Sequence, residues 1–513
     1  MSFMLVFLAL SLVAVTLVAW HFIHSLWLRP KFLENFLRKQ GFVGNPYRPI
    51  NGDLADITHM SQSSLSKPMP ILSHDLVPRL APFAQHLINL HGENTFMWHG
   101  SKPKVSIVKP ELLREVFTKY DVFRKLPVGS RSTFGLVLRD GEDWAKVRRI
   151  INPAFHSEKL KNMLPLMEAS VDAMLSKWEE MIERKDQVEV DVYSYLSSMA
   201  GDVIARTSFG SSYEQGKRLF QLEHESVCLK IQSMQSIHNF IPGWRYLPTK
   251  TNRKIKELDK ETKKLVENLV ENKKKAIKAG DKTFKDDLLS IMLESNEKDI
   301  KENGVGITLQ ELIAECRLFL LAGKDTTASL LTWTFLLLTQ YQDWQTKARD
   351  EVLLHFGKDT SPTFEGLNAL KTVNMILHET LRFYPPVPEL SRVVAKDTKL
   401  KNFSLSHEIG VSIPTLIVHR DPEIWGSDAN EFNPSRFSKG VSNASSVQGS
   451  FCPFGGGPRT CIGQNFALIE AKLALVKILQ RFSFELSPSY VHAPIPIVGL
   501  VPQYGAPLIL YKI

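Results

Sequence analysis

The sequence predicts a mainly α protein with small β-sheets, held to a membrane by a single N-terminal pass. Three observations lead to this prediction. No Asp, Glu, Lys or Arg occurs from Met1 to Leu28, helical periodicity dominates from Pro110 onward, and a glycine-rich loop leads into an amphipathic helix from Ile462 to about Gln480. A hydrophobic content of 43% and a charged content of 23% supply enough material for a large core.

The charge-free N-terminal run is expected to be a membrane anchor. As a helix, its 28 residues would span about 42 Å, more than the roughly 30 Å of a bilayer's apolar core. A cleaved signal peptide needs basic residues before the apolar run, whereas here they follow it, at Arg29, Lys31, Arg38 and Lys39. The positive-inside rule then places the rest of the chain in the cytosol. The alternative is a buried helix of the globular body.

Three prolines between Arg29 and Ile50 predict a stiff connector between membrane and body. With no internal repeat, the chain is expected to form three segments: an anchor at 1–28, a proline-containing linker at 29–50 and a single large domain at 51–513. Within that domain, residues 105–108 predict a strand and residues 250–278 an amphipathic helix with a basic face. The polar, glycine-containing stretch 294–306 predicts a surface loop.

The formal charge of +9 fits an acidic protein partner or an anionic membrane surface, and no nucleic-acid-binding motif accompanies it. Four cysteines in so long a chain are not a disulfide framework and indicate a reducing compartment. Cys452 lacks the glycines and the arginine that precede Cys461, and is expected to be a small buried residue.

The stretch from Phe454 to Gly463 has the most specific pattern in the chain, Phe-x-x-Gly-x-Arg-x-Cys-x-Gly, with Gly457 at its first glycine. Backbone amides and the start of the following helix would lower the pKa of Cys461 and hold it as thiolate. A thiolate is the haem ligand that favours O–O cleavage. Arg459 is placed to reach a haem propionate, and Gly463 lets the helix lie close under the ring. The alternative is a buried cysteine after a glycine-rich turn.

A long helix is predicted from Thr308 to about Thr339, apolar nearly all round before Ala322. Polar residues in the middle of a buried helix are costly and need a reason. Ala322 and Gly323 would remove bulk where oxygen must fit. Thr326 would hydrogen-bond bound dioxygen, and Asp325 would link that site to protons from solvent. The alternative is a polar kink in a core helix.

Trp144 and Arg148 lie four apart on one predicted helical face, where an indole and a guanidinium can clamp one carboxylate. With the two stretches above, this pair resembles the cytochrome P-450 haem-thiolate monooxygenases over the anchor and the whole body. The resemblance implies the fold of that family, residues 51–513 as the catalytic domain, and haem b with Cys461 as its axial ligand. It makes Trp144 and Arg148 propionate-binding residues, and Arg392 stands where the family often has another.

The resemblance also implies a buried ion network behind the cysteine loop, formed by Glu379, Arg382 and Arg436. Ser435 stands where the family more often has glutamate, so that corner is expected to be weaker. Residues 387–390 would line the substrate cavity. Glu389 among them is expected to point outward, the alternative being a pair with a polar group on the substrate.

Further stretches are similar to the plant seventy-two clan, especially the group with secologanin synthase and triterpenoid oxidases: 44–48, 152–155, 241–248 and 463–467. Since members of the clan oxidise several compound classes, the clan does not name the substrate. We expect an NADPH-dependent monooxygenase of an apolar, terpenoid-like small molecule on the cytosolic face of the endoplasmic reticulum. Electrons would come from an NADPH–cytochrome reductase, since no flavin or dinucleotide motif is evident. The alternatives are a haem-thiolate isomerase or dehydratase, and a non-enzymatic haem sensor or binding protein.

Overall fold

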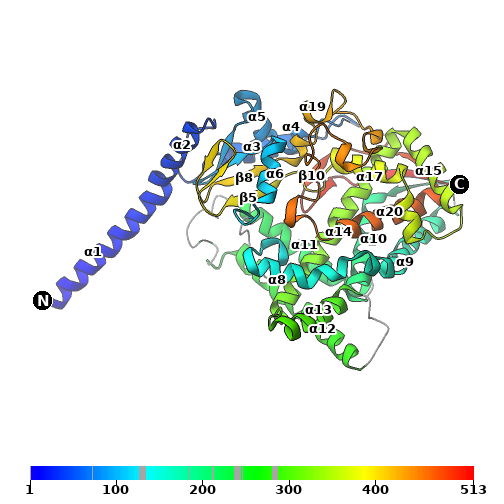
Figure 1. The fold of residues 1–513 in the computed structure, drawn as a ribbon, viewed down its shortest axis with the longest axis horizontal. Helices are drawn as coiled ribbons and strands as arrows, with labels where there is room; N and C mark the ends of the chain where they lie inside the picture. The colour runs from blue at the N-terminus through cyan, green and yellow to red at the C-terminus, as the bar shows by residue number, and fades with distance from the viewer. Residues whose placement is uncertain are drawn as a thin grey trace.

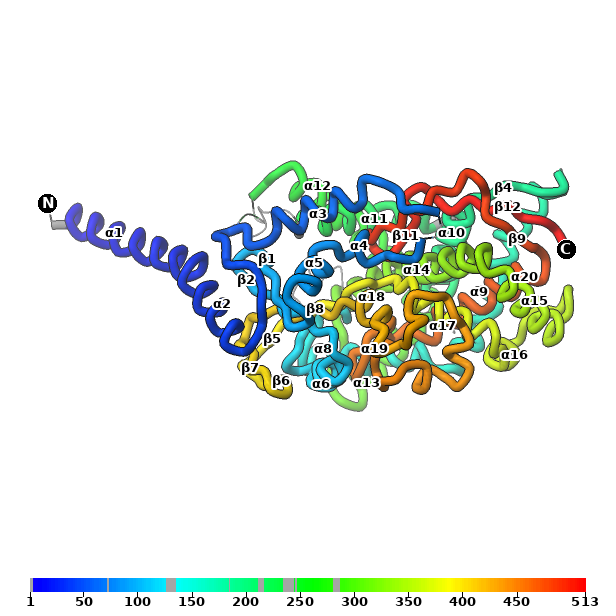
Figure 2. The backbone as a smooth tube through the Cα atoms, turned by 90° about the horizontal axis from the view of Figure 1, so that it is seen from above, coloured from blue at the N-terminus to red at the C-terminus, as the bar shows by residue number. Residues whose placement is uncertain are grey.

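The structure, a computed structural model, describes residues 2–71, 73–125, 135–183, 185–210, 213–235, 244, 247–279 and 287–513. Most of the clan-like stretch 241–248 therefore lies outside the described residues. The five-stranded sheet described below lies at the end of the body that carries the N-terminal helix, and the C-terminus lies at the far end (Figure 2).

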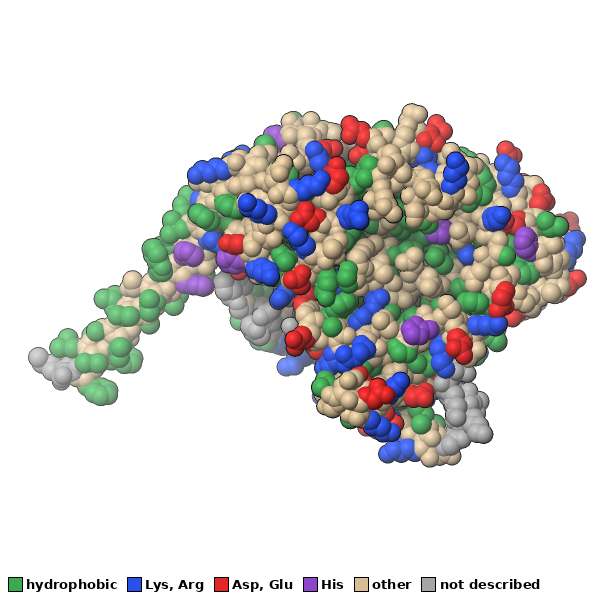
Figure 3. Space-filling model, in the orientation of Figure 1, with side chains coloured by type: hydrophobic (Ala, Val, Ile, Leu, Met, Phe, Trp, Pro, Cys, Tyr) green, Lys and Arg blue, Asp and Glu red, His purple; other side chains and the backbone are tan. Residues whose placement is uncertain are grey.

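The N-terminal segment forms a continuous helix that projects from the body (Figure 1). Helix α1 (Ser2–Ile23) continues through a π-helical turn, His24–Leu28, into α2 (Arg29–Lys39). The described side chains of α1 are exposed, and hydrophobic side chains cover it (Figure 3). Within the described residues it belongs to the one helix long and apolar enough to cross a membrane, as an anchor requires.

The expected stiff connector differs from the structure in its first half, because residues 29–39 are helical. Pro30 removes one N–H from this continuous helix, and the Leu26 carbonyl, four residues earlier, accepts from the Tyr47 hydroxyl at 2.8 Å. Leu33 and Leu37 lie one turn apart and are buried against the body. Glu34 between them pairs with Lys31 at 2.8 Å and with Arg38 at 3.0 Å. Helix α2 thus packs as part of the body.

Helices make up most of the body, as predicted. After α2 they are α3 (Leu54–Leu65), α4 (Val77–Leu80), α5 (Pro82–His91), α6 (Pro110–Thr118), α8 (Gly141–Ile151), α9 (Ser157–Ile182), α10 (Val192–Phe209), α11 (Tyr213–Gln235), α12 (Lys250–Lys278), α13 (Leu288–Asn303), α14 (Leu309–Gln340), α15 (Gln342–Phe356), α16 (Phe364–Ala369), α17 (Thr372–Phe383), α18 (Thr415–Val418), α19 (Pro422–Trp425) and α20 (Gln464–Arg481).

Helix α14 crosses the interior and begins where the sequence predicts. The Thr308 hydroxyl accepts from the Glu311 N–H at 3.3 Å, and the Glu311 carboxylate accepts from the Thr308 N–H at 2.7 Å. This reciprocal capping box satisfies two N–H groups that the helix leaves unpaired. Nearly every side chain from Leu312 to Thr339 is buried, so the helix forms the centre of the core.

The sheets are small. One has the order β1-β2-β8-β5-β3, with β2 parallel to β8 and the other pairs antiparallel. A second has the order β4-β12-β9, and β6-β7 and β10-β11 are antiparallel hairpins. The strands are β1 (Phe96–His99), β2 (Lys102–Ser106), β3 (Phe123–Arg124), β4 (Gln187–Asp191), β5 (Leu390–Val394), β6 (Thr398–Leu400), β7 (Phe403–Leu405), β8 (Gly410–Ile413), β9 (Phe482–Leu486), β10 (Pro494–Pro496), β11 (Leu500–Pro502) and β12 (Pro507–Lys512).

The predicted helix at 250–278 is confirmed as α12, whereas the predicted loop at 294–306 is wrong. Helix α13 continues to Asn303. Its first half is apolar and buried, and the Asp287 side chain caps its N-terminus, so the first turns are stable enough for the helix to extend into the polar residues. It ends at Gly304, whose φ of 67° suits glycine. Cys452 is buried, as expected.

Candidate active site

The loop that precedes α20 packs against α6, and this contact explains two of its glycines. A side-chain carbon at Gly456 would lie 2.6 Å from the Phe117 ring, and one at Gly457 would overlap the Phe117 backbone. Gly457 also has a φ of 62°, which favours glycine. The Cys461 N–H donates to the Phe454 carbonyl at 2.9 Å and closes the loop. These glycines therefore fit the loop to its own protein, a role the sequence did not predict.

Cys461 lies deep in the molecule, yet its side chain is accessible, so it faces an internal space. Burial raises the pKa of the Cys461 thiol, and the Gly463 N–H and the charges of Lys125 and Arg148 offset only part of that rise. The Gly463 N–H acts in the expected direction, but burial outweighs it, so the protein groups alone do not hold Cys461 as thiolate. A coordinated metal ion deprotonates a thiol outright.

Gly463 leaves room beside Cys461. A side-chain carbon there would meet Phe155 at 3.8 Å, which is an ordinary contact. Because packing within the protein does not require a glycine at this position, its absent side chain fits a group lying in the internal space.

Basic side chains gather around that space. Arg392, Arg459 and Arg148 lie close enough to Lys125 that, together with burial, they lower the pKa of Lys125 to about 7. Burial and Arg459 likewise lower the pKa of Arg392 to about 10. Lys125 was missed by the sequence reasoning, because it follows β3 and belongs to no motif. It is brought to the site by the pairing of β3 with β5, the strand that carries Arg392.

Few acids balance these cations. Within the described part of the chain, the one carboxylate that pairs with any of them is Asp140, at 2.7 Å from Arg459. Arg148 donates to the Thr460 carbonyl at 3.0 Å and to Asn152, and Arg392 donates to the Ser391 carbonyl. Buried cations need anionic partners.

Trp144 packs against Arg459. The Arg459 guanidinium lies 4.8 Å from the centre of the Trp144 ring, and its Nη1 is buried without a hydrogen-bond partner among the described residues. Haem b needs cationic hydrogen-bond donors for its two propionates and a thiol for its iron. The site offers an unpaired guanidinium N–H, an excess of cations and a deep, accessible thiol. The residues fit that group.

The middle of α14 faces an internal space as well. Its side chains are buried from Leu312 to Thr339 except at positions 322–324 and 326. The Thr326 hydroxyl donates to the Ala322 carbonyl at 2.6 Å. About two turns before Thr326, Phe319 packs on Phe155, the ring beside Gly463. The structure thus links α14 to the cysteine loop through this aromatic contact.

Gly323 has a different role from the expected one. A side-chain carbon there would lie 2.8 Å from Ile204 of α10. The glycine therefore lets α10 and α14 pack closely. Of the two residues expected to make room for oxygen, Ala322 and Gly323, Ala322 is the exposed one.

Asp325 is buried and has a partner that the sequence did not reveal, His224 of α11. Their closest atoms, His224 Nδ1 and Asp325 Oδ2, are 3.9 Å apart, and Lys324 lies 3.5 Å from the other oxygen. Asp325, together with Cys228, raises the pKa of His224 to about 10. No local pattern pairs α11 with α14, so only the tertiary fold shows this contact.

The predicted ion network is assembled on α17. Arg382 pairs with Glu379 at 2.7 Å, and both side chains are fully buried. Arg436 lies 3.7 Å from Glu379 and 2.8 Å from Asp428. Asp428 supplies the carboxylate that Ser435 lacks, so the corner expected to be weaker has an acid from elsewhere in the chain.

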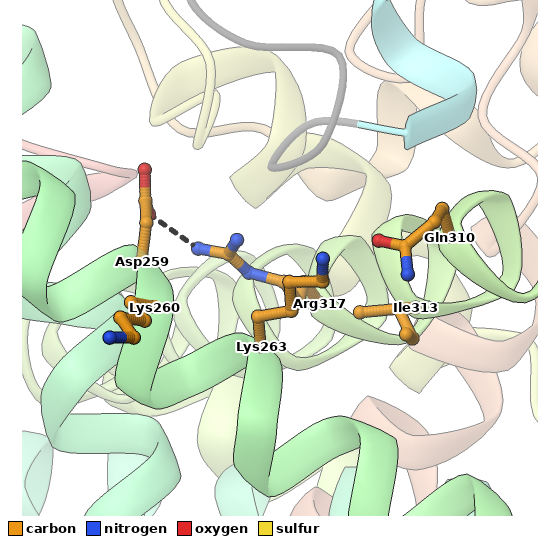
Figure 4. A pocket seen from close by; sticks show the side chains of 6 residues that line it. All are labelled: Asp259, Lys260, Lys263, Gln310, Ile313 and Arg317. Carbon is orange, nitrogen blue, oxygen red and sulfur yellow. Dashed lines mark hydrogen bonds and ion pairs between the residues drawn. The ribbon is translucent and has the colours of Figure 1, made fainter.

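A separate pocket of about 210 Å³ lies between α12 and α14 (Figure 4). Its lining includes Arg317, which pairs with Asp259 at 2.8 Å and also with Glu223. None of the predicted site residues lines it, so the candidate active site lies elsewhere.

The chain is similar over nearly its whole length to known proteins. The family model described as Cytochrome P450 matches residues 77–503. The chain is 48% identical over 509 residues to "Cytochrome P450 CYP72A219" of Panax ginseng, covering 98% of each chain. It is 46% identical to "Cytochrome P450 72A13" of Arabidopsis thaliana, with 98% of each chain covered. It is 44% identical to "Echinocystic acid 23-monooxygenase" of Saponaria officinalis, with 99% of each chain covered.

Proposed function

The chain belongs to the cytochrome P450 family, and we propose that it is a monooxygenase of a terpenoid plant metabolite. The family uses haem with an axial cysteine thiolate. The relatives show that the chain is a monooxygenase that acts on plant metabolites. The terpenoid class is the proposed part. Its support is the relative from Saponaria officinalis, whose name gives the triterpenoid echinocystic acid as substrate.

The observation that carries the proposal is the accessible thiol of Cys461 in a deep space ringed by cations, of which only Arg459 pairs with a carboxylate among the described residues. When bound there, haem supplies the activation of dioxygen and the oxidation of a C–H bond. Cys461 is proposed as the iron ligand. Arg148, Arg392, Arg459 and Lys125 would hold the propionates. Phe454, Gly457 and Gly463 would shape the loop, and Trp144 would support Arg459.

Asp325 and Thr326 are proposed as the groups that deliver protons. The Thr326 hydroxyl is held by the Ala322 carbonyl, and Asp325 follows directly on the accessible stretch of α14. Protonated His224 lies against the Asp325 carboxylate at the side that faces α11. A water between His224 Nδ1 and the Asp325 carboxylate, which are 3.9 Å apart, would carry protons to Asp325, and the Thr326 hydroxyl would pass them on after leaving the Ala322 carbonyl.

The electron source and the location are also proposals. Electrons from NADPH would arrive through a membrane-bound NADPH–cytochrome reductase, because the sequence contains no flavin or dinucleotide motif of its own. Residues 1–28 would anchor the chain in the endoplasmic reticulum membrane, in contact with lipid, with the catalytic body in the cytosol. We place the start of that body at Arg29, since α2 packs on it.

Expression of the full chain with a plant reductase in microsomes tests this function. A panel of terpenoids, plant hormones and fatty acids is supplied with NADPH and labelled dioxygen. A hydroxylated terpenoid that contains one labelled oxygen atom is expected. Conversion without NADPH and dioxygen would favour the isomerase or dehydratase, and haem loading without turnover of any compound would favour a binding protein.

A further inference from the structure

Glu389 lies just before β5, deep in the protein, yet 43% of its side-chain surface is accessible. Cys461 shows the same combination of depth and accessibility. A side chain that is deep and accessible at once faces an internal space. Of the two orientations considered for Glu389, outward or toward a polar group on the substrate, the second fits such a position.

The carboxylate of Glu389 is held by one of its two oxygens. Lys104 of β2 pairs with Oε1, and the hydroxyls of Ser412 and Ser391 donate to the same oxygen at 2.8 and 3.3 Å. Among the described residues no donor reaches Oε2. Burial raises the pKa of Glu389, but Lys104 and Ser412 more than offset this and bring it to about 2, so the group is ionised at neutral pH.

The segment that leads to Glu389 lies beside the middle of α14. The Leu500 N–H donates to the Pro386 carbonyl at 3.0 Å. The Leu500 carbonyl in turn accepts from Trp333 and from Ser329, which follows Thr326 by one turn of α14. Pro386 is thus fixed beside α14, at the buried residues that follow the accessible positions 322–324 and 326.

Toward the C-terminus, the chain leads from Glu389 to the basic cluster formed by Lys125, Arg148, Arg392 and Arg459. Arg392 follows Glu389 within the same extended segment, so the two lie roughly 10 Å apart. Arg392 is one of the cations around the internal space at Cys461. The Ser391–Ser412 pair that holds Glu389 lies on the face of β5 opposite Arg392, because side chains alternate along a strand. Glu389 therefore lies between Pro386 and Arg392 along the chain, and a substrate reaches both Glu389 and the basic cluster only by extending past the start of β5.

We propose that Oε2 of Glu389 accepts a hydrogen bond from a hydroxyl group of the substrate and so makes the enzyme selective for terpenoid alcohols. This inference rests on the proposed function, because it places an apolar substrate in this space. A carboxylate only accepts hydrogen bonds, so a ketone or an ether at that position would leave Oε2 unpaired. Since Lys104 already balances the charge, the site suits a neutral alcohol better than an amine.

A purely structural role is the rival explanation. In that case the Lys104–Glu389 pair would tie β2 to the segment before β5, and its loss would weaken folding without changing which ligand binds. Binding of matched ligands separates the two roles.

The experiment titrates the ferric, haem-loaded full chain with an alcohol, its ketone and its methyl ether, and follows the haem absorption shift. Three carbon skeletons are used: a triterpenoid, a diterpenoid and a fatty alcohol. The variants are Glu389→Gln and the double variant Glu389→Met with Lys104→Met, which leaves no unpaired charge behind. Glu365→Gln, in the exposed pair with Lys161, is the matched control.

The wild type and the control are expected to bind the alcohol about tenfold more tightly than the ketone and the ether, as the loss of a hydrogen bond to a charged group requires. Both Glu389 variants should bind all three within about threefold of one another. An unchanged alcohol preference in both variants, or no alcohol binding in the wild type, would overturn the proposal. If only the fatty alcohol showed the preference, the role of Glu389 would stand while the terpenoid function failed.

Discussion

At the scale of single residues, the site is defined by a shortage of negative charge. Lys125, Arg148, Arg392 and Arg459 surround a deep space in which Asp140 is their one paired carboxylate within the described residues. A folded protein does not retain such an excess without a partner anion, because buried charges without a counter-charge are costly. The propionates of haem would supply that counter-charge, so folding and haem binding depend on the same residues.

Substitution of Arg459 tests this dependence. Arg459→Ala removes the guanidinium with the orphaned Nη1 and is expected to weaken haem binding about tenfold or more, the cost of a lost charge-assisted hydrogen bond. The rate of haem transfer to an acceptor protein measures it. Arg124→Ala, an exposed cation beside the cluster, is the control and should transfer haem at the wild-type rate. Equal transfer rates for both variants would contradict the assignment.

His224 is expected to stay protonated through neutral pH. Its pKa rises from 6.5 to about 10 through Asp325 and Cys228, so its contribution to stability is fully present below pH 6.5 and is lost as the pH rises through about 10. Imidazole NMR of the labelled protein measures this pKa directly, and Asp325→Asn should lower it toward 6.5. A His224 signal that titrates near 6.5 in the wild type would show that the pair does not form.

At the scale of elements, α17 and α14 are fixed by different forces. Helix α14 is held by apolar burial along most of its length and by its capping box. Helix α17 instead carries the fully buried Glu379–Arg382 pair, and Arg382 also donates to the carbonyls of His419 and Ala429 at 2.7 Å. A single guanidinium thus ties α17 to the chain that leads to the cysteine loop.

Removal of that guanidinium should be costly. Arg382→Met leaves the Glu379 carboxylate buried without its partner and is expected to reduce the free energy of unfolding by about 3–5 kcal/mol. Urea unfolding of the haem-loaded protein measures the change. Lys161→Met removes an exposed ion pair with Glu365 and should leave stability almost unchanged. A small effect of Arg382→Met would mean that the network contributes little to the fold.

At the scale of the whole molecule, the anchor and the body share one continuous helix. The apolar half, α1, lies outside the body, while α2 buries Leu33 and Leu37 against it (Figure 1). The boundary between membrane segment and body therefore falls near Arg29, well before the prolines at 46 and 49.

Two truncations test this boundary. A chain that begins at Arg29 keeps α2 and is expected to fold and bind haem. A chain that begins at Gly41 loses Leu33 and Leu37 from the core, and burial of each such side chain contributes about 1.5–3 kcal/mol. Thermal unfolding should show the shorter chain to be markedly less stable. Equal stability of the two would show that α2 belongs to the anchor alone.

The sequence predicted those parts that depend on local patterns. Periodicity or motif spacing along the sequence predicted the apolar anchor, the start and course of α14, the basic helix α12 and the cysteine loop. The contacts that it missed join distant segments: Lys125 reaches the site through a strand pairing, His224 through α11, and Asp428 through a loop. The helical course of residues 294–303 was missed because polar composition on an exposed face resembles a loop.

The central claim is that the accessible thiol of Cys461 ligates the haem iron. The most direct measurement is the absorption spectrum of reduced, carbon monoxide-treated microsomes that contain Cys461→Ala, with Cys452→Ala as the matched control. The thiolate-type band is expected to disappear in Cys461→Ala and to remain in Cys452→Ala. A thiolate-type band that persists in Cys461→Ala, or disappears only in Cys452→Ala, would contradict the account.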